Sequence, residues 1–173
     1  MPFALRFGAT GSMTIEMDPA NAPYGVTVYE VGCAVGATDG VDIYYDIPFP
    51  IEYPVEPTEP LLYFTDAAGT TGYTQDFRAP AAAVTWRAQV RGMESGDVVN
   101  LQWRLQSGSL DGQNLMLVDG QTKAILVANM MTTTSFTVRD ANRSLLILYG
   151  TTNHQPVAGT DQATMLATDP TLT

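Results

Sequence analysis

Three carboxylates lie within eight positions of one another in the stretch GATDGVDIYYDIPFP, residues 36–50: Asp39, Asp42 and Asp46. Hard oxygen ligands at this density favour calcium, because Ca²⁺ binds about six to eight oxygen atoms. The spacing differs from that of an EF-hand, which requires a fixed series of acids and a closing glutamate. We therefore predict a Ca²⁺ site formed by these three residues, with Asp76 as a further ligand.

The same residues have two interpretations without metal. In the first, Asp39 begins a turn, Asp42 caps neighbouring backbone amides and Asp46 stays solvated, as short polar side chains commonly do in loops. In the second, Asp76 and Arg78 approach the loop and form a buried ion pair. All three interpretations remain open from the sequence.

Other chemistry has little support in the sequence. The single histidine, His154, is far from any nucleophile motif, and no G-x-S-x-G turn is present. One histidine and one cysteine supply too few ligands for zinc. Cys33 lies in the apolar run VTVYEVGCAV and is expected to be a buried structural thiol. We predict that the protein is not an enzyme.

The charge is strongly negative and unevenly distributed. The net charge is −10, and no Lys or Arg stands between Arg6 and Arg78. Phosphate binding needs a basic surface, so nucleic acid and anionic membranes are excluded as partners. No apolar run reaches the ~18 residues of a membrane span. An anionic field of this kind attracts cations.

Hydrophobic residues alternate with polar ones along most of the chain, which predicts strands. The expected strands are residues 3–7, 12–17, 25–33, 61–65, 84–91, 98–105, 113–119, 123–128, 135–140 and 143–150. About ten short strands separated by turn residues indicate an all-β protein, an antiparallel β-sandwich of immunoglobulin-like or jelly-roll-like type. Trp86 and Trp103 fall on the inward faces and are expected in the core.

We predict one β-sandwich domain over residues 1–150 and a C-terminal extension over 151–173, which packs in cis or on a neighbouring subunit. Residues 48–60 hold five of the eleven prolines and are expected to form an extended strap. Tyr44, Tyr45 and Tyr53 lie in or beside this acidic region. They either pack the strap onto the sheet or stack on carbohydrate.

Residues Tyr29 to Gly150 resemble a module of bacterial extracellular proteins. The resemblance rests on GATDGVDIYYDIP, the Pro-rich strap, TQDFR (residues 74–78), TWRAQV, VNLQWRL, LMLVD and TSFTV. The second half is similar to the immunoglobulin-like or sorting-type β-sandwiches of large secreted bacterial proteins. The resemblance implies an extracellular or cell-surface location and a non-enzymatic role.

Self-assembly is the function we expect from these features. Residues 1–11 carry Phe3, Leu5 and Phe7 on one face of a possible donor strand, which could pair with an open sheet edge of a neighbour. The predicted partner is thus another copy of the chain, in a filament, tube or surface layer stabilised by Ca²⁺. The alternative is a carbohydrate-binding or adhesion module whose partner is a polysaccharide.

Overall fold

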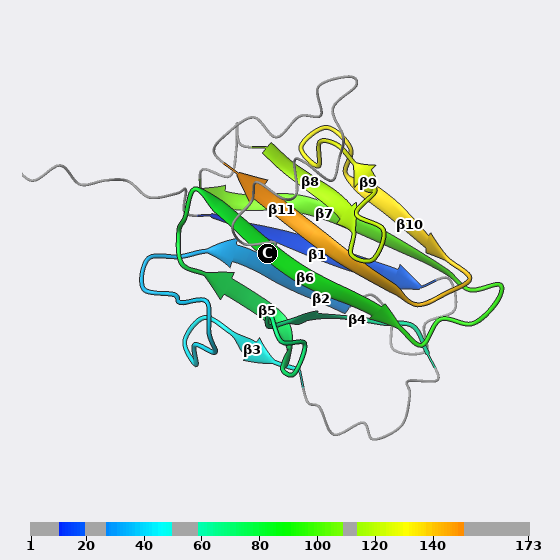
Figure 1. The fold of residues 1–173 in the computed structure, drawn as a ribbon, viewed down its shortest axis with the longest axis horizontal. Helices are drawn as coiled ribbons and strands as arrows, with labels where there is room; N and C mark the ends of the chain where they lie inside the picture. The colour runs from blue at the N-terminus through cyan, green and yellow to red at the C-terminus, as the bar shows by residue number, and fades with distance from the viewer. Residues whose placement is uncertain (1–10, 20–26, 50–58, 109–113, 151–173) are drawn as a thin grey trace, which may run out of the picture.

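The computed structural model of the chain describes residues 11–19, 27–49, 59–108 and 114–150. The regular elements in these ranges are all strands (Figure 1). They are β1 (Gly11–Pro19), β2 (Thr27–Cys33), β3 (Ile47–Pro48), β4 (Leu61–Thr65), β5 (Gly72–Arg78), β6 (Ala83–Arg91), β7 (Val98–Gly108), β8 (Asn114–Asp119), β9 (Ile125–Val127), β10 (Ser135–Arg139) and β11 (Arg143–Gly150). The predicted all-β class is confirmed.

The strands form one continuous sheet in the order β10-β7-β1-β2-β5-β4-β6-β11-β8-β9, and β3 pairs with β5. Neighbours are antiparallel except β2 and β5, which run parallel with Glu30 opposite Gln75. The sheet is therefore mixed and nearly barrel-shaped. The predicted division into two packed sheets, immunoglobulin-like or jelly-roll-like, is not confirmed, because the described strands belong to a single sheet.

The two ends of the strand order meet at a seam, which we define as the gap between β9 and β10 bridged by residues 128–134. The Met130 amide donates a hydrogen bond to the Leu115 carbonyl of β8 (2.8 Å). The Trp103 indole Nε1 of β7 donates to the Met130 carbonyl (2.8 Å), and the Trp103 amide donates to the Thr134 carbonyl (3.0 Å). These bonds tie β7 to β8 and complete the near-barrel.

The interior is filled by the apolar side of each strand. Trp86, Phe64 and Val31 are 0% exposed and Trp103 is 6% exposed, so the predicted core position of both tryptophans is confirmed. Burial of a large apolar side chain contributes about 1.5–3 kcal/mol. The apolar residues whose alternation predicted the strands are therefore also the ones whose burial contributes most to the stability of the fold.

A second, smaller apolar cluster lies on the opposite face of β8 and β11. It consists of Met116, Val118, Leu146 and Leu148, with Ile125 packed against them. β11 is thus buried on both faces, which explains why its sequence, RSLLILYG, contains the continuous apolar run LLILY rather than an alternating pattern.

Several predicted features lie outside the described residues. These are the donor strand with Phe3, Leu5 and Phe7, most of the Pro-rich strap with Tyr53, and the C-terminal extension over 151–173. Within the described ranges, no helix has the length and apolarity needed to cross a membrane.

Candidate functional site

The acidic loop, defined as residues 34–48, leaves the end of β2 and returns as β3 beside β5 (Figure 1). At its start, the Ala34 amide donates a hydrogen bond to the Arg78 carbonyl at the end of β5 (3.2 Å). At its end, Ile47 and Pro48 pair with β5. Both ends of the loop are therefore fixed to the same strand.

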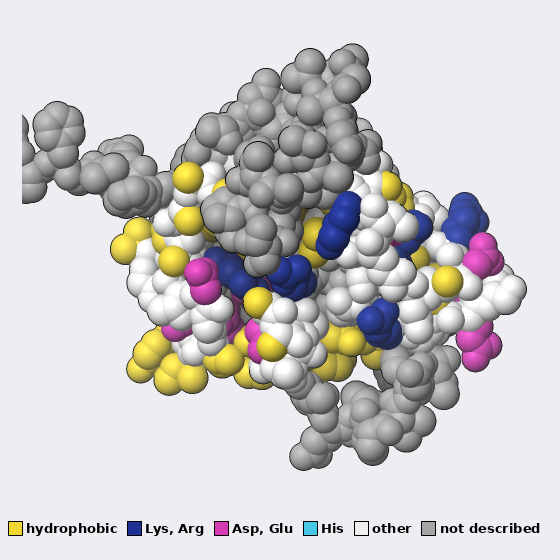
Figure 2. Space-filling model, viewed as in Figure 1, with side chains coloured by type: hydrophobic (Ala, Val, Ile, Leu, Met, Phe, Trp, Pro, Cys, Tyr) yellow, Lys and Arg dark blue, Asp and Glu magenta, His cyan; other side chains and the backbone are white. Residues whose placement is uncertain are grey.

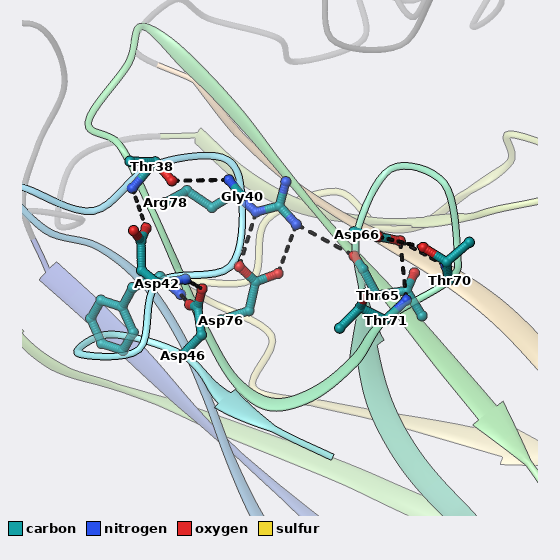
Figure 3. A network of polar contacts seen from close by, with 11 residues as sticks. Thr38, Gly40, Asp42, Asp46, Thr65, Asp66, Thr70, Thr71, Asp76 and Arg78 are labelled. Atoms are coloured by element: carbon teal, nitrogen blue, oxygen red, sulfur yellow. Dashed lines mark hydrogen bonds and ion pairs between the residues drawn. The ribbon is translucent and has the colours of Figure 1, made fainter. Parts of the chain in front are cut away.

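Asp46 holds the middle of the loop against β5 (Figure 3). Its side chain is buried, with the residue 5% exposed. Oδ1 accepts a hydrogen bond from the Phe77 amide (2.9 Å), and Oδ2 accepts one from the Asp42 amide (2.7 Å). The solvated position expected for Asp46 in the plain-turn interpretation is wrong, because the loop folds back over this carboxylate.

Asp42 organises the tip of the loop. Its carboxylate accepts a hydrogen bond from the Thr38 amide, and its carbonyl accepts hydrogen bonds from the Tyr45 amide (2.9 Å) and the Asp46 amide (2.7 Å). The amide-capping role predicted for Asp42 is therefore confirmed. Asp39 is exposed.

The two described tyrosines of the loop differ in their surroundings. The Tyr45 hydroxyl donates to the Val35 carbonyl (2.9 Å), and the Tyr45 carbonyl accepts from Gln75 Nε2 of β5 (2.8 Å). Tyr45 thus cross-links the loop. Tyr44 is 89% exposed and points its ring into solvent, so it is the one of the two that is available to a partner.

Asp76 and Arg78 of β5 form the buried ion pair that the sequence left as an alternative (Figure 3). Arg78 Nε donates to Asp76 Oδ1 (3.0 Å) and Nη2 donates to Oδ2 (2.8 Å). Nη2 also donates to the Thr65 carbonyl of β4 (3.4 Å). The side chain of Asp76 is 5% exposed and that of Arg78 is 11% exposed, so this ion pair is shielded from water.

Burial dominates the electrostatics of this pair. It raises the pKa of Asp76 above its ordinary value, and the hydrogen bonds and charge of Arg78 offset only part of that increase. For Arg78, burial lowers the pKa, but the carboxylate of Asp76 outweighs that effect and the net pKa is raised. The guanidinium therefore stays charged and is the main group that opposes the rise in the pKa of Asp76.

Asp66, which the sequence did not single out, closes the turn between β4 and β5. Its carboxylate accepts hydrogen bonds from the Thr70 amide (2.8 Å), the Thr70 hydroxyl (2.8 Å) and the Thr71 amide (3.4 Å). Burial acts to raise the pKa of Asp66, but these hydrogen bonds outweigh it and lower the pKa. The signal in the sequence was an Asp followed four residues later by Thr in a Gly-containing turn.

The described residues contain no group of three or more His, Cys, Asp or Glu side chains placed to hold a metal ion. Asp42 and Asp46 share one network, whereas the carboxylate of Asp76 is turned toward Arg78. Both oxygens of Asp46 and both of Asp76 already accept hydrogen bonds. Ca²⁺ binding at the four aspartates therefore stays a prediction.

The acidic loop also carries an unusual set of exposed apolar side chains, of which the sequence indicated only Tyr44, as a residue that either packs on the sheet or stacks on carbohydrate. Six large hydrophobic residues are well exposed among the described residues, and five lie on this loop. They are Val35 (78%), Val41 (54%), Ile43 (81%), Tyr44 (89%) and Ile47 (53%). In Figure 2, hydrophobic side chains gather at the lower left, where Figure 1 places β3 and the acidic loop. We call these five residues the apolar tip.

Cys33, at the end of β2, is 2% exposed, and burial together with the charge of Asp39 raises the pKa of its thiol to about 12. Because the pKa rises from 9.0 to about 12, the fraction of Cys33 present as thiolate near neutral pH falls to about a thousandth of its ordinary value. We expect iodoacetamide at pH 8 to label the folded protein far more slowly than the urea-unfolded chain, measured by mass spectrometry. Equal labelling rates would contradict the buried position.

Comparisons with known proteins identify no relative. No protein-family model matches the chain, and neither a curated protein nor a solved structure matches it. The resemblance to bacterial extracellular sandwich modules therefore stays a prediction. The function must be inferred from the geometry of the acidic loop itself.

Proposed function

We propose that the protein is a non-enzymatic structural subunit whose copies assemble through the acidic loop. The supporting observation is the apolar tip: five of the six well-exposed large hydrophobic residues among those described lie on one loop. Single exposed hydrophobic residues are common, but a contiguous group marks an interaction surface. The extracellular or cell-surface setting is carried over from the resemblance to secreted bacterial modules.

The loop is also held in one conformation before any partner binds. Asp46 anchors it to the Phe77 amide of β5, and Asp42 and Tyr45 cross-link its interior. A surface that is already ordered loses less conformational entropy on association. Ile43 and Tyr44 are therefore presented at a fixed position, as a docking element requires.

The charge of the loop indicates what kind of surface it can meet. Asp39 and Asp42 lie on it, and it contains no Lys or Arg. Two such loops would repel each other, so a symmetric loop-to-loop contact is disfavoured. Seven of the eight bases of the chain lie between Arg78 and Arg143, against five of its eighteen acids, so the second half of another copy is a more favourable surface for the loop than the acidic first half.

Carbohydrate binding is the second candidate, and the exposed ring of Tyr44 favours it. An aromatic face that is 89% exposed can stack on a sugar ring. Val35, Val41, Ile43 and Ile47 are less suited to this role, because they offer no hydrogen-bond donors or acceptors in their side chains. Assembly accounts for all five residues of the apolar tip.

The first test is the substitution Ile43→Asp, which puts a charge at the centre of the apolar tip. We expect the wild-type protein to gain mass with concentration in sedimentation velocity, and the variant to associate at least about tenfold more weakly. Val28→Asp is the matched control, since Val28 is 55% exposed but lies on β2 outside the loop.

A wild-type protein that stays monomeric at every concentration would refute the assembly proposal. If that monomer were also retained on a polysaccharide column, and Tyr44→Ser abolished retention, carbohydrate binding would replace it. If Val28→Asp weakened association as much as Ile43→Asp, the contact would not be specific to the acidic loop.

A further inference from the structure

The seam has a cavity beside it that the proposed function does not yet use. It has a volume of about 570 Å³ and lies between β9, β10 and the start of β11. Leu126 and Phe136 supply apolar walls, while Arg139, Arg143 and Asp119 supply charge. We call this cavity the seam groove. Its volume is within the range typical of pockets that enclose a small-molecule ligand, about 300–1,000 Å³, so it has room for a few side chains.

The charges in the seam groove leave one cation available. Arg143 Nε contacts Asp119 Oδ2 (3.2 Å), and the Arg143 guanidinium lies 5.9 Å from the centroid of the Phe136 ring. The other carboxylate oxygen of Asp119 accepts hydrogen bonds from the Gln121 and Thr122 amides (2.9 and 2.8 Å). Arg139 is exposed and has no ion-pair partner among the described residues.

Two strained turns border the seam groove. The described non-glycine residues with positive φ are Lys123 (62°) and Asp140 (61°). Lys123 follows the lining residues Gln121 and Thr122, and Asp140 follows Arg139. Such backbone strain is more frequent at functional sites than elsewhere, because the surrounding structure must hold it in place.

We propose that the seam groove of one copy receives the apolar tip of the next copy. Ile43 and Tyr44 would contact the apolar walls at Leu126 and Phe136, and Asp39 would face Arg139. Apolar side chains thus meet apolar walls, and the exposed carboxylate of Asp39 meets the exposed guanidinium of Arg139, which has no ion-pair partner among the described residues. This inference rests on the proposed function and names the receptor surface for it.

The positions of the two surfaces determine the kind of assembly. The acidic loop follows β2 and pairs with β5, which are in the middle of the strand order, whereas β9 and β10 are its two ends. In a nearly closed barrel, the middle and the ends face opposite sides, and Figure 1 shows β3 far from β9 and β10. A loop cannot fill the groove of its own copy. Repetition of this head-to-tail contact produces a ring or a filament.

The energetic test is a charge exchange in the full-length chain. Arg139→Glu and Asp39→Arg should each weaken self-association about tenfold, measured by sedimentation, since each places like charges together. The double variant should recover to within about threefold of wild type, because the pair is restored in reverse. Arg104→Glu is the control, as Arg104 is exposed on β7 and does not line the groove.

The geometric test uses cysteine cross-linking, which the buried Cys33 does not obscure. A mixture of Tyr44→Cys and Gln121→Cys proteins should give disulfide-linked heterodimers under mild oxidation, and Gln121 is chosen because it is exposed and lines the groove. Cross-linking no greater than with a mixture of Tyr44→Cys and Arg104→Cys would overturn the proposal.

The outcomes separate the two proposals. A protein that is monomeric throughout overturns both. A protein that assembles and is weakened by Ile43→Asp, but not by Arg139→Glu, keeps the loop as a contact and overturns the seam groove as its receptor. If Leu5→Asp abolished assembly while the charge exchange had no effect, the contact between copies would instead depend on the N-terminal segment, and the proposal would again be overturned.

Discussion

Replacement of Arg78 by methionine is expected to lower the free energy of unfolding by about 3–5 kcal/mol at pH 7. The Asp76 carboxylate is 5% exposed and receives two hydrogen bonds from this guanidinium. Methionine keeps much of the length and apolar volume of the arginine stem but leaves the buried carboxylate without a counter-charge. The loss should appear as a lower midpoint in urea unfolding followed by circular dichroism.

The same variant should be more sensitive to pH than the wild-type protein. Burial already raises the pKa of Asp76, and removal of Arg78 eliminates the main opposing cause. An acid whose pKa is higher in the folded state destabilises the fold above that pKa, and this penalty disappears as pH falls toward the unfolded value. The difference in stability between wild type and variant should therefore shrink between pH 7 and pH 4.5.

An exposed ion pair provides the control for this prediction. Arg104 and Glu16 are 3.2 Å apart, but their side chains are 68% and 37% exposed. Arg104→Met should cost about 0.2–1 kcal/mol, as expected for solvated pairs. An Arg78→Met loss no larger than this would contradict a shielded pair. The double variant Asp76→Leu/Arg78→Met should recover part of the loss, because no buried charge remains.

Local apolar patterning predicted several strands well, both where one face is buried and in β11, which is buried on both faces. The expected bounds of β4 and β11, residues 61–65 and 143–150, agree with the structure, and those of β6 and β10 differ by one residue. Turn residues mark these ends, and the period of two is local information. The predicted division into two sheets is not confirmed, because the order in which strands become neighbours depends on contacts between distant segments and not on local patterns.

β5 shows this limit most clearly. Its sequence, GYTQDFR, contains Asp76 and Arg78, and residues 74–78 were predicted as a motif and not as a strand. The charged side chains of Asp76 and Arg78 are tolerated because they form an ion pair along one face of the strand. Its parallel pairing with β2 brings together residues 45 positions apart, Glu30 and Gln75, which no local pattern indicates.

Only those features of the candidate site that depend on neighbouring residues could be predicted from the sequence. The clustering of Asp39, Asp42 and Asp46 was visible in the sequence, as was the possible pair of Asp76 with Arg78. The partner of Asp46 was not, since the Phe77 amide is 31 residues away. The exposure of Ile43 was not predicted, and that of Tyr44 was only one of two alternatives, because apolar residues between strands are equally consistent with packing under a loop.

Asp46→Ala is expected to lower the free energy of unfolding by about 2–4 kcal/mol, since it leaves two backbone amides without acceptors at about 1–3 kcal/mol each. These are the amides of Asp42 and Phe77. Asp46→Asn should cost about half as much, because the amide oxygen can still accept one bond while its NH₂ group opposes the other donor. Chemical denaturation of the three proteins measures this order.

The same substitution should also weaken self-association, although Asp46 is 5% exposed and cannot touch a partner directly. Without its two hydrogen bonds the loop must be ordered when it binds, and that entropy is subtracted from the affinity. We expect Asp46→Asn to associate more strongly than Asp46→Ala under conditions where both remain folded. Asp66→Ala is the control, since it removes a similar amide-binding carboxylate from the β4–β5 turn. If Asp46→Ala assembled as well as wild type, the fixed conformation of the acidic loop would not be the source of its affinity.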